Sequence, residues 1–261
     1  MQTDLLGDDI NRHTADFSFT AFAPNRDGRF TQFSFMDVAI GMGLREHAAF
    51  INRWAPTALS FSCNALASAA PAGESVDLNL IRDWHALTSL GFVLEHPVCF
   101  ELAAEHWQAV QGLNHLALLG QHAPAGLDFS GKLAGLNTLL IDHAVFTPMA
   151  GQLTQTRDLE LRAAPKSWSG HELQAFQNLK RLKLNACGLQ RLPEALLHTP
   201  LEMLILAGCR GLGDLNLLRQ MKQLKYLHIY SCPRVQDFSF LHDMPQLRAL
   251  DISRPITDVD L

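Results

Sequence analysis

The sequence has 261 residues, 48% of them hydrophobic, and a formal net charge of −5 at pH 7. This is enough apolar material for one continuous core, whereas a protein that binds the nucleic-acid backbone needs clustered Lys and Arg. No apolar run reaches the roughly 18 residues of a membrane span, and the N-terminal residues are polar and acidic where a signal peptide is basic and then apolar. We therefore expect a cytoplasmic protein that binds neither nucleic acid nor membrane.

The first 54 residues contain no repeat and are expected to form an N-terminal cap. Residues 16–22 and 30–35 alternate Phe with Thr and Ser around the turn-rich segment 24–29, which predicts a β-hairpin. Apolar residues then recur at helical spacing from Met36 to Trp54, which predicts a helix. A hairpin and a helix at this place would cover the open end of a repeat array.

The remainder of the chain, 55–261, is dominated by one pattern, LxxLxL followed by Cys or Asn, which returns every 20 to 23 residues. A fixed period of this size indicates stacked supersecondary units, each too small to bury its own apolar face. The clearest copies are Leu179, Leu182, Leu184 and Cys187, then Leu201, Leu204, Leu206 and Cys209, then Leu224, Leu227, Ile229 and Cys232.

Extending the same register in both directions predicts nine strands. The outward-pointing residues just before the first core position of these strands are, in chain order, Ala58, Ser89, His115, Thr138, Asp158, Arg181, Met203, Tyr226 and Ala249. The first two steps are long for this class, so we expect a loop insertion over 67–77 and a helix over 98–110.

These motifs resemble leucine-rich repeats of the short bacterial type. The resemblance implies an α/β solenoid in which a curved parallel β-sheet forms the concave face, and it implies that this face binds a protein. No C-terminal cap is visible in the sequence, and an uncovered sheet edge invites pairing with another chain. A homodimer through the C-terminal end is therefore one expectation.

Three of the five cysteines, Cys187, Cys209 and Cys232, follow the strands at equivalent positions, where Asn64 stands in the first repeat. At this bend a Cys or Asn side chain can satisfy backbone groups, so we expect buried, free thiols that pack as small apolar groups. Neither CxxC nor HExxH occurs, and the histidines are scattered. We expect no metal site and no cofactor.

Strand residues alternate between the core and the concave face, and this alternation selects the candidate binding residues. One group is apolar and aromatic and is called the tyrosine patch; it consists of Met203, Ile205, Tyr226, His228 and Tyr230. Tyr is enriched at the energetic centre of interfaces, so contact with a partner is expected here. The alternative is that these side chains only shield the concave surface.

A second group on the predicted face is charged and flanks the tyrosine patch. Opposite charges fall on adjacent strands, close enough for lateral pairing. Such pairs either orient a partner or only neutralise each other, which stabilises the fold by about 0 to 1 kcal/mol per exposed pair. The charged candidates are Asp142, Asp158, Glu160, Arg162, Arg181, Lys183 and Asp251.

The function favoured by the sequence is a non-enzymatic module that binds a protein partner. His228, Asp251 and Ser253 have the residue types of a hydrolase triad, but an open sheet face offers no oxyanion hole, so catalysis is the residual reading. A small acidic module without a fused effector domain suits an inhibitor, such as an immunity protein that blocks a toxin. The alternative is an adaptor or a secreted effector that recruits a target protein.

Overall fold

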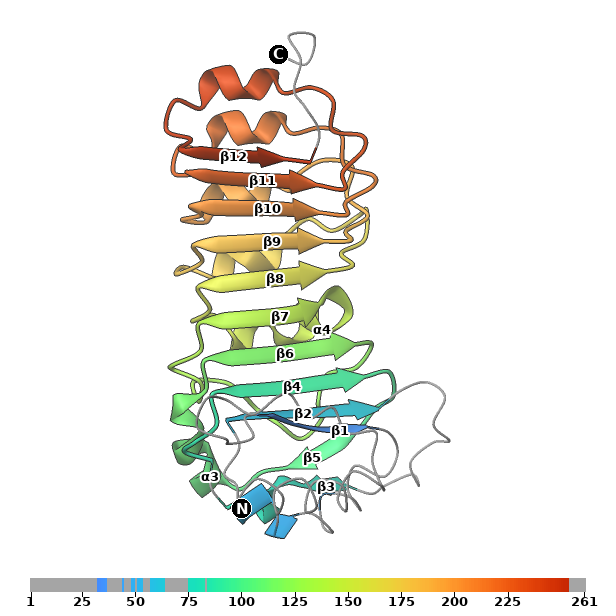
Figure 1. The fold of residues 1–261 in the computed structure, drawn as a ribbon, viewed down its shortest axis with the longest axis vertical. Helices are drawn as coiled ribbons and strands as arrows, with labels where there is room; N and C mark the ends of the chain where they lie inside the picture. Colours follow the sequence, from blue (N-terminus) through green and yellow to red (C-terminus); the bar gives the residue numbers. More distant parts are fainter. Residues whose placement is uncertain are drawn as a thin grey trace, which may run out of the picture. The chain divides into compact units, whose positions relative to one another are not determined.

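The computed structural model describes residues 32–36, 44, 48–49, 51–53, 57–63, 75–82 and 84–253. The chain forms two compact units, Met1–Gly135 and Leu136–Leu261, and each is described by itself. In both units the strands lie parallel and side by side (Figure 1). All nine predicted strands are present, and each begins at the residue just before its first core position.

The second unit contains six strands in an unbroken parallel series. Each pairs with the next in a register that joins equivalent repeat positions, so that Leu182 of one strand is level with Leu204 of its neighbour. The strands are β7 (Thr138–Asp142), β8 (Asp158–Arg162), β9 (Arg181–Asn185), β10 (Met203–Ala207), β11 (Tyr226–Tyr230) and β12 (Ala249–Ile252).

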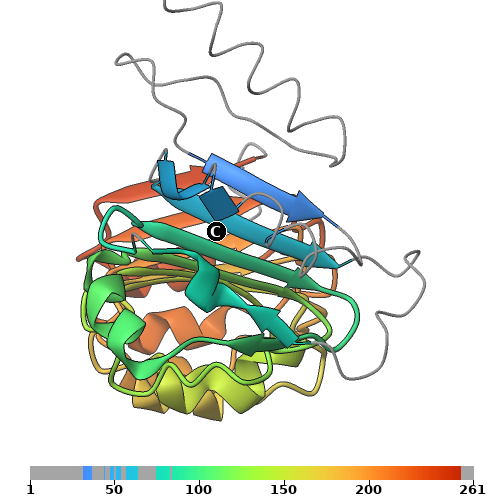
Figure 2. The same ribbon diagram turned by 90° about the horizontal axis from the view of Figure 1, so that it is seen from below.

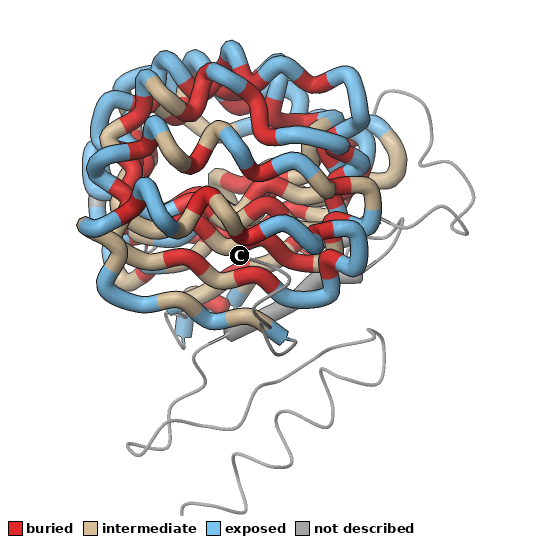
Figure 3. The backbone as a smooth tube through the Cα atoms, turned by 90° about the horizontal axis from the view of Figure 1, so that it is seen from above, coloured by how far each residue is buried: buried red, intermediate tan, exposed pale blue. Residues whose placement is uncertain are grey.

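Alternation along these strands decides which side chains form the core. Leu182 and Leu184 are 1% and 0% exposed, whereas Lys183 between them is partly exposed. Figure 3 shows the same alternation of buried and accessible positions around the coil of the second unit. A one-residue shift would move every Leu to solvent, so the LxL spacing fixes the register.

Short helical turns lie on the side of the second unit opposite the strands (Figure 2). The first repeat contains an α-helix followed by a short 3₁₀ helix, and the later repeats contain one 3₁₀ helix each. These segments are α4 (His143–Met149), η3 (Ala150–Gln152), η4 (His171–Ala175), η5 (Glu194–His198), η6 (Asn216–Gln220) and η7 (Ser239–Asp243). Their inward Leu and Phe side chains, such as Leu196 and Phe240, close the core.

A left-handed residue follows four successive strands of the second unit. Ala163, Ala186, Gly208 and Ser231 have φ angles of 56°, 51°, 62° and 54°. The backbone N–H of Ala186 donates to the carbonyl of Ala207, which is the last residue of the next strand, over 2.8 Å. This turn ends each strand and directs the chain toward the helical side.

The cysteine at each bend behaves as the sequence predicts. Cys187, Cys209 and Cys232 are buried free thiols, and each donates to two backbone carbonyls. The Sγ atom of Cys209, for example, lies 3.4 Å from the carbonyl oxygen of Leu184 and 3.6 Å from that of Ala207. The neighbouring Cys209 thiol and burial together raise the pKa of Cys187 and Cys232.

The first unit contains a second parallel series and a small additional sheet. The series is β1 (Gln32–Met36), β2 (Ala58–Cys63), β4 (Ser89–Leu94) and β6 (His115–Gly120), and the small sheet pairs β3 (Ser75–Asp77) with β5 (Cys99–Glu101). The helical segments are η1 (Leu78–Leu80), α3 (Ala104–Ala109) and η2 (Val110–Gly112). The ring of Phe92 stacks on Phe61 at 5.6 Å and meets Phe100 edge-on at 4.9 Å.

Two expectations for the first unit were wrong in part. The predicted loop insertion over 67–77 ends in strand β3, and the predicted helix over 98–110 begins with strand β5. These two strands pair with each other, and Val76 and Phe100 are buried. Neither three-residue strand has enough length to show an alternation in the sequence.

The predicted N-terminal cap is described only in part. Met36, which was assigned to the helix, ends strand β1, and β1 pairs in parallel with β2. Leu44 and Ile51 are helical and buried, as expected. The segment 16–22 lies outside the described residues, as do Asn64 and 254–261, so the hairpin and the homodimer contact stay predictions. Across the described residues, the helices are too short or too polar to span a bilayer.

The strand register leads to a first test. Leu182→Ala removes a side chain that is 1% exposed, so we expect it to lower the free energy of unfolding by about 2 to 5 kcal/mol. Lys183→Ala should lower it by less than about 1 kcal/mol. Urea melts of both variants check this, and equal losses would contradict the register.

The left-handed turn leads to a second test. Ala186 is exposed and has a positive φ angle, which costs an L-residue roughly 1 to 2 kcal/mol. Ala186→Gly should therefore raise the free energy of unfolding by about 1 kcal/mol after the added unfolded-state entropy of Gly. Ala175→Gly is the control, because its residue lies in η4 without a positive φ angle, and it should destabilise. A loss of stability in both variants would contradict the strain.

The buried thiols lead to a third test. Cys187, Cys209 and Cys232 should react slowly with a thiol reagent in the folded protein, because burial excludes the reagent. Cys99, which is exposed, is the internal control and should react first. Peptide mapping after labelling with and without denaturant measures this. Rapid native labelling of all three thiols would show that the bends are open.

Candidate functional site

The predicted contact residues lie together on one face of the second unit, which is called the open face. They occupy the alternate positions of β7–β12 that point away from the core, and none is buried. The structure therefore brings together the residues Asp142, Asp158, Glu160, Arg162, Arg181, Lys183, Met203, Ile205, Tyr226, His228, Tyr230 and Asp251.

The tyrosine patch occupies β10 and β11. The strand register places Met203 beside Tyr226 and Ile205 beside His228. Tyr230 is 41% exposed, more than any other large hydrophobic side chain among the described residues. Ala207 has a small side chain and lies between Asn185 and Tyr230 in the sheet. It is 2% exposed, so the sheet surface at this position beside the patch is covered.

Lys183 joins the tyrosine patch to the charged flank. Its Nζ atom lies 3.0 Å from Oε2 of Glu160, and it also interacts with the hydroxyl group of Tyr230. Partial burial lowers the pKa of Lys183, but the contacts with Glu160 and Tyr230 outweigh burial and raise it overall. The ammonium group therefore stays charged at the border of the patch.

The predicted lateral ion pairs are formed. Arg181 contacts both carboxylate oxygens of Asp158, with Nε at 2.6 Å from Oδ1. The hydrogen bond with Asp158 raises the pKa of Arg181. Arg162 lies 3.5 Å from Asp142. These two acid–base pairs, with that of Lys183 and Glu160, leave the middle of the open face close to neutral and hold its side chains together.

One arrangement of buried and left-handed residues recurs in successive repeats of the second unit. Each repeat of β8–β11 supplies two buried strand residues, a left-handed residue and then a buried Ala or Cys at the bend. The period of 20 to 23 residues and the parallel register connect these positions from one strand to the next. The chain has the leucine-rich-repeat fold.

Solved structures of other leucine-rich-repeat proteins are similar to this one. An internalin C2 from Listeria monocytogenes is 16% identical, with a TM-score of 0.40, over 70% of this chain and 77% of that chain. The leucine-rich-repeat domain of the type III effector XopL is 19% identical, with a TM-score of 0.46, over 80% and 79%. A second internalin from Listeria monocytogenes is 15% identical, with a TM-score of 0.37, over 83% and 82%.

No protein-family model and no curated protein matches the sequence.

The triad-like residues on the last two repeats are not arranged for hydrolysis. Nδ1 of His228 lies 3.4 Å from Oδ2 of Asp251, whose side chain is 76% exposed. Oγ of Ser253 accepts a hydrogen bond from the backbone N–H of Ser231, and within the described part of the chain no hydrogen bond joins Ser253 to His228. A nucleophile needs a bonded and oriented base, and this repeat supplies none.

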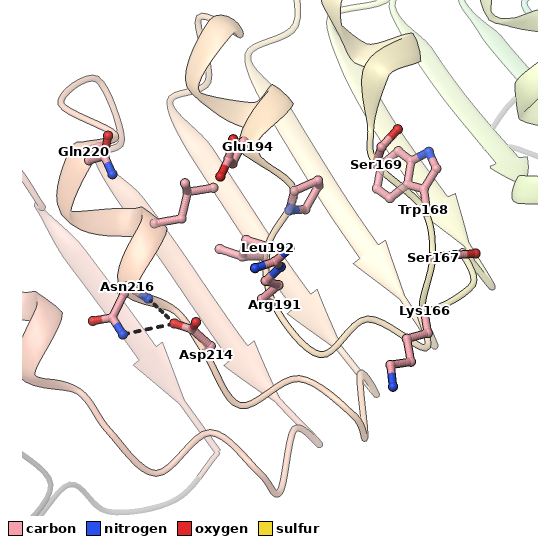
Figure 4. A pocket seen from close by; sticks show the side chains of 12 residues that line it. Lys166, Ser167, Trp168, Ser169, Arg191, Leu192, Glu194, Asp214, Asn216 and Gln220 are labelled. Atoms are coloured by element: carbon pink, nitrogen blue, oxygen red, sulfur yellow. Dashed lines mark hydrogen bonds between the residues drawn. The ribbon is translucent and has the colours of Figure 1, made fainter.

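A polar hollow of about 600 Å³ lies where three connectors leave the strands of successive leucine-rich repeats (Figure 4). Its apolar residues include Trp168, Leu192 and Pro193, and its rim carries both charge signs. The indole N–H of Trp168 donates to the buried carboxylate of Glu172 at 2.9 Å. Burial raises the pKa of Glu172, but hydrogen bonds, including those from Thr147 and Trp168, lower it overall. These hydrogen bonds fix the orientation of the Trp168 ring in the wall of the hollow.

The sequence-based set of contact residues omitted two kinds of side chain. Asn185 donates to Oε1 of Glu160 at 2.8 Å and so belongs to the charged flank; its outward strand position was the available signal. The residues that line the connector hollow carry no periodic signal, because connectors differ in length between repeats.

Proposed function

We propose that this leucine-rich-repeat protein is a non-enzymatic protein-binding module that uses the open face of β7–β12. The observation that carries the proposal is the exposure of Tyr230 beside the half-buried side chains of Met203, Ile205 and Tyr226. The core of a repeat needs no large apolar group on its outer face. An aromatic group held there is available to fill a pocket on a partner.

The charged flank supports the same proposal. The ion pairs of Asp158 with Arg181 and of Glu160 with Lys183 are formed before any partner arrives. Preformed pairs leave few side chains to be ordered on binding, which lowers the entropy cost of association. Their charges would set the orientation and the association rate more than the affinity.

Within this proposal, we suggest that binding itself is the biological activity, as in a cytoplasmic inhibitor or an immunity protein that covers a toxin. Two observations support this suggestion. The chain has an acidic net charge, and on the described open face His228 bonds to Asp251 while Ser253 bonds to the backbone of Ser231. An adjacent toxin gene would favour inhibition. An adjacent secretion-chaperone gene would favour the alternative, an adaptor or effector that recruits a target protein.

Truncation of the tyrosines tests the proposed face. A partner is first recovered by pull-down and identified by mass spectrometry. Tyr226→Ala and Tyr230→Ala should each weaken its binding by about 2 kcal/mol or more, because each removes an aromatic anchor. Calorimetry of the purified pair measures this. Gln174→Ala in η4, on the helical side, is the control and should bind as the unchanged protein does.

Charge reversal separates the two parts of the face. Asp158→Lys should act mainly on the association rate and its salt dependence. If both tyrosine variants bind normally while changes on the helical side or in the first unit abolish binding, the open face is not the site.

A further inference from the structure

Charge is divided unevenly between the two units of the chain. Met1–Gly135 contains seven Lys and Arg against fourteen Asp and Glu, whereas Leu136–Leu261 contains fourteen against twelve. The second unit therefore carries a small net positive charge within an acidic protein. Its cationic side chains are concentrated in one region.

The cations gather in the five residues that precede each of the strands β8–β12, at the tails of these arrows in Figure 1. These segments contain five Lys and Arg but a single acid, Glu202. We call this surface the basic edge; its cations are Arg157, Lys180, Lys222, Lys225 and Arg248.

Backbone hydrogen bonds hold the basic edge in register. The carbonyl of Lys180 accepts from the N–H groups of Glu202 and Met203 at 2.8 and 3.0 Å. The carbonyl of Glu202 accepts in the same way from Lys225 and Tyr226. Equivalent residues of successive repeats therefore lie one strand apart, about 4.8 Å, and form a row of charges.

The basic edge already binds one carboxylate. Glu202 lies between two lysines, with Oε1 3.0 Å from Nζ of Lys180 and Oε2 2.8 Å from Nζ of Lys225. Hydrogen bonds from Lys225 and Lys180 lower the pKa of Glu202 to about 2. The ammonium groups of this edge are thus positioned to hold carboxylates.

Further capacity for anions remains next to Glu202. Lys222, Lys225 and Arg248 line a hollow of about 500 Å³ together with Glu202, Gln223 and Gln246. The side-chain amide of Gln246 donates one hydrogen bond to the carbonyl of Met221 at 3.2 Å. Lys222 donates to the backbone carbonyl of Asp243 at 3.2 Å. Within the described residues, neither Arg248 nor Arg157 at the other end of the row forms an ion pair.

We propose that the basic edge binds an acidic peptide segment, rich in Asp or Glu, of a protein partner. The carboxylates of the segment take the position next to Glu202, in the hollow between Lys222, Lys225 and Arg248. The amides of Gln223 and Gln246 supply donors and acceptors for its backbone. This surface is separate from the tyrosine patch, and the proposal does not rest on binding at the open face.

The chemistry of the edge favours a peptide over single-stranded nucleic acid. Binding of single strands uses aromatic side chains on which bases stack, and the only Phe, Tyr or Trp in these segments is Phe176, which is 1% exposed.

The test uses the full chain and a fluorescein-labelled hexaglutamate peptide, with binding followed by fluorescence anisotropy. Lys225→Ala/Arg248→Ala should weaken binding about tenfold, because two charge-assisted contacts are lost. Arg210→Ala/Arg234→Ala removes the same charge from exposed connectors that follow the strands, and it should change binding less than about twofold. Lys225→Arg/Arg248→Lys should retain binding, and thermal melts verify that each variant is folded.

Four results would overturn the proposal. One is the absence of measurable peptide binding in low-salt buffer, and another is an equal loss in both charge-removing variants, which would indicate a general charge effect. Tighter binding of a six-nucleotide oligothymidine that depends on Lys225 and Arg248 would assign the edge to nucleic acid. A dimer in light scattering that dissociates in Lys225→Ala/Arg248→Ala would assign it to a second copy of the chain.

Discussion

The structure of the second unit depends on lateral burial between parallel strands. Each of the strands β7–β11 contributes two buried Leu or Ile side chains, such as Leu204 and Leu206, which neighbouring repeats must cover because one repeat is too small to do so. The turn, the thiol at the bend and the short helical segment all serve to bring the next strand back to this contact. The outward strand positions and the residues just before each strand lie outside this contact. Their side chains can therefore differ in charge and polarity between repeats.

The strand positions were predictable because their signal is local and repeated. Two Leu residues separated by one position specify both the strand and its buried side, so all nine predicted strands are present. The pairing of β3 with β5 was not predictable, because it joins two three-residue segments and neither has a visible alternation. The short 3₁₀ helices likewise lack the length over which a helical period can be read.

The candidate site was predictable to the level of position and pairing. Alternation placed Lys183 and Glu160 on one face, and the structure brings them into contact. The contact of Tyr230 with Lys183 across an intervening strand depends on side-chain reach, which the sequence pattern does not encode. The basic edge was overlooked because the net charge of the whole chain conceals a local excess of cations, and only the division into two units makes it visible.

The hydrogen bond from a left-handed residue to the end of the next strand has a consequence for how this protein can change in length. Ala163 bonds to Asn185, Ala186 to Ala207 and Gly208 to Tyr230, so these three bends present the same donor to the following repeat. Gain or loss of a whole repeat among them would recreate matching surfaces on both sides of the junction. Loss of one residue within a strand would instead turn Leu side chains out of the core. The connectors can differ in length between repeats, but a strand and its bend can be gained or lost only together.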